Sequence, residues 1–174
     1  YLINAWIENA NGQKEKTFAV TPPLFVSEPA SENTLRIIYA GPALPADRES
    51  LFYMNVKAIP SMDKSKLNDN TLQLAIISRI KLYYRPANLA MPPEEAREKL
   101  TFRRSAGKLT LVNPTPYYLT VTELNAGTRV LDNALVPPMG ETSVKIPDDA
   151  GAEITYRTIN DYGALTPRVI GVMR

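Results

Sequence analysis

The chain has 174 residues, of which 44% are hydrophobic and 22% charged, so it can bury real cores and is neither a disordered nor a collagen-like chain. Its 20 Lys and Arg residues against 18 Asp and Glu give a formal net charge of +2, which is too small to predict binding to nucleic acid. The absence of His and Cys excludes Ser–His and Cys–His nucleophile pairs, thiol redox chemistry and zinc sites built on nitrogen or sulfur.

Short segments rich in β-branched and aromatic residues recur along the chain, and turn-forming residues bound most of them. Proline interrupts the chain so often that the longest window without it covers residues 61–85, which disfavours long helices. This spacing, without helices between the strands, predicts antiparallel sandwiches rather than βαβ units. The strands predicted first are residues 2–7, 34–39, 51–56, 108–112, 117–123 and 142–146.

A proline-flanked connector at residues 85–93 predicts a boundary between two domains, residues 1–87 and 93–174. Each domain is near the roughly 100 residues of an immunoglobulin-like sandwich. Directly after the connector, residues 93–100 predict a helix of two turns at most, because proline begins it and acids fill its first turn.

Residues 71–85 form the longest strand candidate. Period-two alternation places Leu72, Leu74 and Ile76 on one face, together with Ile80 and Leu82. Two interpretations stay open: a buried strand whose apolar face fills its own core, or an edge strand that is lent to another protein.

Lys81 and Arg85 lie on the opposite face of this strand, immediately before the predicted boundary. They are either simply solvated, or an anion site that captures a carboxylate, or part of an ion network joining the domains. Glu49 and Asp161 are the carboxylates that such a network would use.

Motifs typical of other functional classes do not occur in the sequence. No G-x-G sequence occurs, the acidic residues lack the spacing of a calcium loop, and no apolar run approaches the roughly 18 residues of a membrane span. We therefore expect no cofactor, no metal and no membrane insertion. Lys64 and Lys66, in the loop before the long strand, are either gatekeepers against aggregation or solvated charges.

Seven short motifs follow one another along the chain: residues 20–25 (VTPPLF), 33–37 (NTLRI), 47–52 (DRESLF), 55–60 (NVKAIP), 80–86 (IKLYYRP), 113–118 (NPTPYY) and 159–163 (INDYG). In this order they resemble the motifs of the PapD-like periplasmic pilus chaperones. The resemblance implies an all-β fold of two immunoglobulin-like β-sandwich domains in a boomerang arrangement. It also implies that the first domain lacks its N-terminal strand in this chain, together with a basic residue that this strand carries.

The same resemblance implies a function. Such a chaperone binds fimbrial subunits in the periplasm by donor-strand complementation and delivers them to an outer-membrane usher. By resemblance, Leu72, Leu74 and Ile76 are the donated side chains, and Lys81 anchors the subunit's C-terminal carboxylate. Glu49, Arg85 and Asp161 form an interdomain ion network, and self-association of the free molecule stays open.

Two alternatives come from other functional classes. A structural or adhesive tandem of immunoglobulin-like domains explains the strand pattern without strand donation. A hydrolase rests only on paired carboxylates such as Glu94 and Glu95, which are also typical of an ordinary helix N-terminus.

Overall fold

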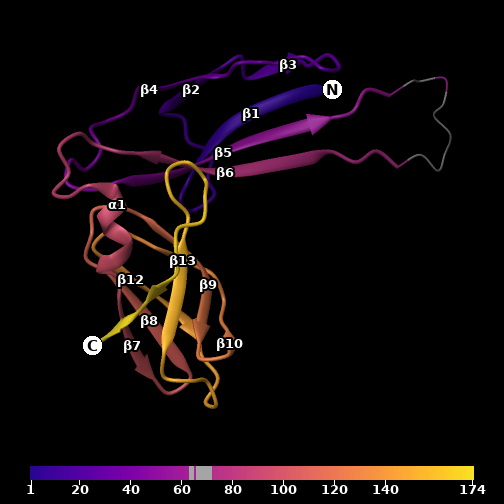
Figure 1. Cartoon of the computed structure of the whole chain (residues 1–174). Helices are drawn as coiled ribbons and strands as arrows, with labels where there is room; N and C mark the ends of the chain where they lie inside the picture. Colours follow the sequence, from indigo (N-terminus) through magenta and orange to yellow (C-terminus); the bar gives the residue numbers. More distant parts are fainter. Residues whose placement is uncertain (63–64, 66–71) are drawn as a thin grey trace. The chain divides into compact units, whose positions relative to one another are not determined.

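The computed structural model describes residues 1–62, 65 and 72–174, which divide into two compact units (Figure 1). The N-terminal unit comprises Tyr1–Leu44 and Ser50–Tyr84, and the C-terminal unit comprises Pro45–Glu49 and Arg85–Arg174. The chain therefore crosses between the units after residues 44, 49 and 84. The sequence prediction placed residues 45–49 in the first domain, whereas the structure groups Pro45–Glu49 with the C-terminal unit.

The N-terminal unit contains a four-stranded antiparallel sheet and a two-stranded one. The larger sheet has the order β3-β1-β5-β6, with β1 (Leu2–Asn9), β3 (Leu24–Val26), β5 (Ser50–Ile59) and β6 (Ile76–Tyr84). The smaller sheet pairs β2 (Phe18–Thr21) with β4 (Arg36–Tyr39).

Alternation along β1 and β5 builds the core of this unit. Ala5 and Ile7 on β1 are cross-strand partners of Val56 and Met54 on β5, so these side chains share one face. The buried core consists of Ala5, Ile7, Phe52 and Met54, against which Phe18, Val20, Leu35, Leu44, Val56 and Leu82 pack. The core therefore extends onto β6 only at its C-terminal end, through Leu82.

The C-terminal unit begins with one turn of α-helix, α1 (Pro93–Ala96), continued by the 3₁₀ turn η2 (Arg97–Lys99). This confirms the predicted short helix. One sheet has the order β10-β9-β13-β14, with β11 also pairing with β9; the other has the order β12-β8-β7-β15. The strands are β7 (Thr101–Ser105), β8 (Lys108–Asn113), β9 (Leu119–Ala126), β10 (Arg129–Val130), β11 (Ala134–Val136), β12 (Gly140–Lys145), β13 (Ile154–Thr158), β14 (Val169–Ile170) and β15 (Val172–Met173).

Large side chains from both sheets fill the core of the C-terminal unit. Phe102 and Tyr156 lie with ring centroids 5.3 Å apart, and Leu111, Val121 and Val136 are fully buried near the centre of this cluster. The Tyr156 hydroxyl donates a 2.6 Å hydrogen bond to the carbonyl of Arg97, which fixes the 3₁₀ turn to the core. All described strand pairs are antiparallel except β15 with β7, which is parallel.

The all-β prediction is confirmed, and every strand predicted first corresponds to a strand within a few residues of its ends. The long strand predicted at residues 71–85 is too long, because β6 begins at Ile76. Leu72 and Leu74 lie in the irregular segment before it, whereas Thr71, Lys64 and Lys66 lie outside the described residues. In the described part of the chain, no helix has the length and apolar character needed to cross a membrane.

Candidate functional site

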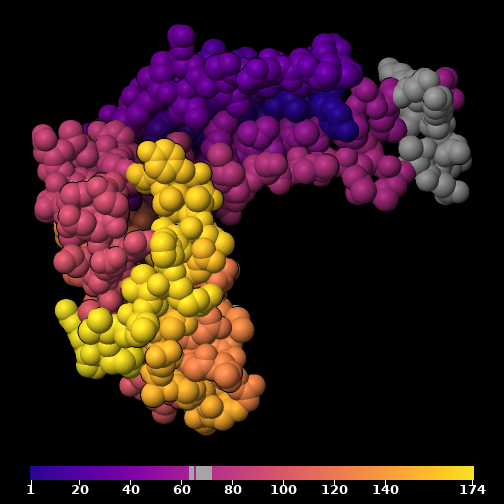
Figure 2. Space-filling view, viewed as in Figure 1, coloured from indigo at the N-terminus to yellow at the C-terminus, as the bar shows by residue number. Residues whose placement is uncertain are grey.

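Strand β6 lies at the edge of its sheet and pairs only with β5 among the described residues. Its aliphatic side chains are unusually exposed: 66% for Ile76 and 64% for Ile80. Leu72 and Leu74, just before the strand, are also exposed, at 79% and 68%. The interpretation of this segment as a buried strand is therefore wrong, because the structure contains an exposed strand at the edge of its sheet. Figure 2 shows β6 as a band along one margin of the N-terminal unit.

The register of β5 and β6 decides which side chains share a face. Ile80 lies opposite Met54 and Leu82 opposite Phe52, so the predicted apolar face of β6 continues the core-facing side of the sheet. Leu82 packs on the core, whereas Ile76 and Ile80 lie farther along the hairpin and stay exposed. The strand thus carries apolar side chains that its own unit does not cover.

The opposite face of the same strands, here called the polar face, carries charged side chains together with the exposed Ile77. Arg79 forms a 3.3 Å ion pair with Glu8 on β1, and its guanidinium lies 4.0 Å from the ring centroid of Tyr53 on β5. Lys81 is exposed on this face as the cross-strand partner of Tyr53. Desolvation lowers the pKa of the Lys81 ammonium.

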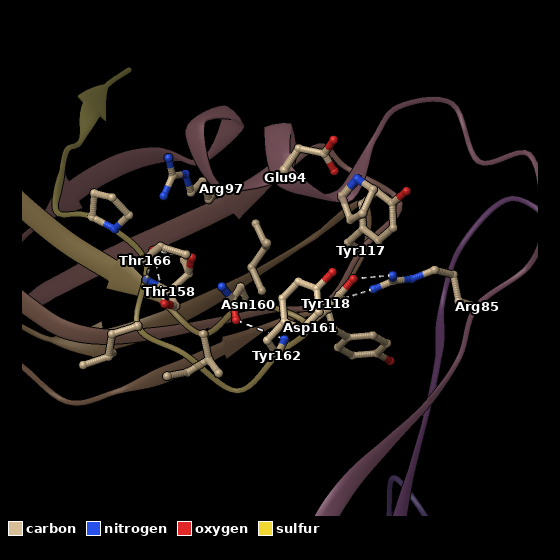
Figure 3. Close-up of a pocket in the computed structure, with 15 residues that line it drawn as sticks. Arg85, Glu94, Arg97, Tyr117, Tyr118, Thr158, Asn160, Asp161, Tyr162 and Thr166 are labelled. Atoms are coloured by element: carbon tan, nitrogen blue, oxygen red, sulfur yellow. Dashed lines mark hydrogen bonds and ion pairs between the residues drawn. The ribbon is translucent and has the colours of Figure 1, made fainter.

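Three of the predicted residues come together in the C-terminal unit. Arg85 Nε donates to Glu49 Oε1 at 2.8 Å, and its two Nη atoms donate to the Asp161 carboxylate at 2.7 and 2.8 Å (Figure 3). The Glu49 side chain is only 1% exposed, whereas that of Asp161 is 51% exposed. One arginine therefore bridges a buried and a half-exposed carboxylate.

Residues of the 113–118 segment also contact this network, a contribution that the sequence did not predict. The backbone N–H of Tyr118 donates to Glu49 Oε2 at 2.7 Å, and the Arg85 guanidinium lies 5.0 Å from the ring centroid of Tyr117. The N–H of Glu49 donates to the carbonyl of Pro116 at 2.9 Å. The motif at 113–118 has no charged residue, so its sequence did not indicate that it would contact the ion network.

The carboxylates of the network differ in pKa because they differ in burial. The hydrogen bond from Arg85 lowers the pKa of Asp161. Desolvation outweighs the bonds from Tyr118 and Arg85 and raises the pKa of Glu49. The Arg85 pKa is raised, chiefly by its hydrogen bonds to Asp161, so this guanidinium stays charged at all relevant pH.

The network lies at the crossings of the chain between its two units. Glu49 directly precedes Ser50, and Arg85 directly follows Tyr84, where the chain passes from one unit to the other. Lys81 and the exposed aliphatic residues belong to the N-terminal unit instead. Among the described residues, no group of three or more acidic side chains is placed to hold a metal ion.

Comparison with known proteins gives the class of a protein with this all-β fold and an exposed β edge. Residues 1–90 match the N-terminal domain family of PapD, described as a pili and flagellar-assembly chaperone. Residues 95–169 match the C-terminal domain family of the pili assembly chaperone PapD. The chain belongs to the PapD family and is a pilus-assembly chaperone.

Particular relatives support the same conclusion. The chain is 75% identical to the chaperone protein FimC of Escherichia coli K12 over 174 residues, which cover 99% of this chain and 72% of FimC. It is 60% identical to FocC of Escherichia coli, covering all of this chain and 78% of FocC. The crystal structure of the periplasmic chaperone SfaE has 57% identity and a TM-score of 0.86, with 99% of this chain and 84% of that chain covered.

A structure of the SafB chaperone in complex with the SafA pilin of Salmonella enterica also matches, with 29% identity and a TM-score of 0.88 over 98% of this chain and 82% of that one. Membership of a family of non-catalytic chaperones replaces the hypotheses of a hydrolase and of a structural or adhesive tandem. It also explains why neither His nor Cys is needed.

Proposed function

We propose that this chaperone binds a fimbrial subunit by lending it the edge of β6, and that it does so in the periplasm before delivery to an outer-membrane usher. The observation that carries the proposal is an edge strand that is open on one side and bears aliphatic side chains its own unit leaves exposed. Backbone hydrogen bonds along the edge supply affinity, and alternate side chains fill pockets of the partner.

Leu72, Leu74 and Ile76 are the side chains assigned to the groove of the subunit. Their exposure of 79%, 68% and 66% leaves most of their apolar surface available for burial in a complex. Full burial of one such side chain contributes about 1.5–3 kcal/mol, so three of them supply about 5–9 kcal/mol before ordering costs. That is enough to hold a subunit that is unstable alone.

Lys81 is assigned to the subunit's C-terminal carboxylate. Its ammonium lies on the polar face of β6, five residues beyond Ile76, so one strand carries both the apolar contacts and a cation. An ammonium–carboxylate contact fixes the register of an added strand, because a shift by one residue would exchange its two faces.

Glu49, Arg85 and Asp161 are assigned to holding the two domains at their working angle. Support comes from the positions of Glu49 and Arg85 at two chain crossings and from the bidentate contact between Arg85 and Asp161. Glu49 and Arg85 each lie next to a crossing, so the bond between them restrains two of the three crossings and would limit how freely the N-terminal unit can reorient.

Binding of a purified pilin subunit to variants of the chain tests this function. Leu74→Glu should keep the thermal unfolding temperature of the free chain but weaken binding by about 10- to 150-fold, the equivalent of one lost buried aliphatic side chain. The matched control is Ile170→Glu, because Ile170 is 65% exposed but lies on β14 in the other unit. Ile170→Glu should leave binding unchanged.

The carboxylate anchor needs its own pair of variants. Lys81→Ala should abolish subunit binding, while Lys57→Ala, which removes a cation from the same face of neighbouring β5, should not. Unchanged binding by Lys81→Ala would overturn the anchor alone. Unchanged binding by both Leu74→Glu and Lys81→Ala would overturn strand donation through β6.

A further inference from the structure

A cavity of about 470 Å³ opens in the C-terminal unit, bordered on one side by the ion network and extending beyond it to the helical segment. Figure 3 shows Glu94 and Arg97 of the helical segment on one side, and Thr158, Asn160 and Thr166 on the other. The volume lies within the range of small-molecule sites, which combine apolar walls with a few polar groups. Aromatic and aliphatic walls come from Tyr118, Tyr162, Ile159 and Leu165.

Arg97 is a polar group in this wall whose hydrogen bonding is incomplete. Its side chain is only 25% exposed, yet the ion pair it makes is a long one, 3.5 Å to the exposed Glu98. Its buried Nε atom finds no hydrogen-bond partner in the described part of the chain. A desolvated guanidinium with incomplete bonding favours an added anion, and a carboxylate is the anion whose geometry matches it.

The apolar side of the cavity is also incompletely covered. Tyr162 is 94% exposed at its rim, on a turn fixed by the Asn160 side chain, which accepts hydrogen bonds from the N–H groups of Tyr162 and Ala164. Leu165 and Ile159 are 43% and 39% exposed beside it. A rigid turn that presents an aromatic ring next to open aliphatic side chains suits the apolar body of a ligand.

Charges in the wall restrict the ligand further. Asp161 also lines the cavity, where it accepts two hydrogen bonds from Arg85, a guanidinium that it shares with Glu49. Glu94 lines the cavity one turn before Arg97, so a second anionic group on the ligand would meet a like charge. We infer that the cavity binds a small monocarboxylic acid, with its carboxylate on Arg97 and its aromatic or aliphatic body against Tyr162 and Leu165.

The test is a titration of the chain with 3-phenylpropionate, followed by the amide NMR signals of Asn160, Tyr162 and Thr166. We expect saturable shifts with a dissociation constant of about 1 mM, as expected for a ligand of this size. The uncharged amide of the probe and 2-phenylethylamine should bind at least about tenfold more weakly, since they lack the charge that Arg97 recognises.

Three variants locate the site. Arg97→Gln should weaken binding of 3-phenylpropionate about tenfold, and Tyr162→Ala about three- to tenfold. Lys99→Gln, which removes an exposed charge from the same helical segment outside the cavity wall, should have no effect. Because Tyr162 is almost fully exposed, its truncation leaves the fold unchanged and keeps the test interpretable even if Arg97→Gln lowers stability.

Three results would overturn the inference: no saturable shift at the cavity, equal affinity of Arg97→Gln and the unmodified chain, or preferential binding of the amine, which would place the ligand on Glu94. The proposal is independent of strand donation, because its residues lie in the C-terminal unit and its readout needs no subunit. Failure of one proposal therefore leaves the other standing.

Discussion

Removing Arg85 should cost far more stability than removing its exposed partner. Arg85→Ala leaves the Glu49 carboxylate, 1% exposed, with only the Tyr118 N–H at 2.7 Å as a described hydrogen-bond donor. Removing one partner of a buried ion pair costs about 3–5 kcal/mol of stability. Because the Arg85 side chain is 35% exposed, the expected loss lies at the lower end of this range, about 3 kcal/mol. Asp161→Asn removes a half-exposed partner, so its expected cost is about 0.5–1 kcal/mol.

The pH dependence distinguishes this reasoning from a simple loss of packing. Burial raises the folded pKa of Glu49 above its ordinary value of 4.5, so ionising it costs stability above that folded pKa. Without Arg85 the pKa of Glu49 rises further, and the cost should shrink as the pH falls from neutral toward the ordinary value of 4.5 and the carboxyl binds a proton. The lowered pKa of Asp161 acts in the opposite direction, but only as the pH falls below about 3.8.

Urea unfolding followed by NMR of core methyl groups, such as those of Leu111 and Val136, measures the stability of the C-terminal unit separately from the other unit. The double variant Glu49→Gln with Arg85→Ala removes the uncompensated charge, so it should be about 1–2 kcal/mol more stable than Arg85→Ala at neutral pH. Equal losses for Arg85→Ala and Asp161→Asn, or a loss in Arg85→Ala that does not change with pH, would refute the argument.

Two further predictions concern the frame that holds this site. Asn113→Ala should destabilise the C-terminal unit by about 3 kcal/mol in the same urea assay, because it removes the hydrogen bonds that the buried amide donates to the carbonyls of Tyr117, Val136 and Pro137 at 2.7, 3.2 and 3.0 Å. Gly127→Ala should lower stability by about 2 kcal/mol or more, because a Cβ on this residue, at φ +60°, would lie 2.9 Å from the Cα of Gly151. Gly107→Ala, at φ +68° with open space around it, is the control and should cost about 1 kcal/mol in thermal unfolding; equal effects at the two glycines would contradict a steric origin.

Local pattern predicts the fold well where a strand is long and alternates. The segment at residues 51–56 became part of β5, because Phe52 and Met54 point into the core at period two. Strands of two or three residues, such as β10, β14 and β15, carry too few side chains for periodicity to reveal. Their place depends on neighbours distant in sequence.

Some features of the candidate site could likewise be predicted from the sequence, and others only from the fold. The alternation of Ile76 and Ile80 was readable from the sequence, but whether that face is covered depends on which strand lies at the edge of the sheet. The carboxylates of Glu49 and Asp161 were named from the sequence as candidate partners of an ion network, a role that the resemblance also implied. The Tyr118 N–H that donates to Glu49 is a backbone group with no signature in the sequence. The cavity beside Arg97 left no pattern at all, because its walls come from segments about 60 residues apart.

The two faces of β6 explain how an exposed edge can serve binding without promiscuous pairing. Natural edge strands are protected by charge, and the polar face here carries Arg79, held by Glu8 and Tyr53, together with Lys81. A partner strand that pairs with β6 must therefore accept two cations beside Ile77 on one face and aliphatic side chains, those of Ile76 and Ile80, on the other. A second copy of the strand would bring its own cations against them, whereas a strand that ends in a carboxylate and borders an apolar groove complements both faces. Under the proposed function, the side chains of β6 that bind a subunit thus also restrict which strands can pair with this edge.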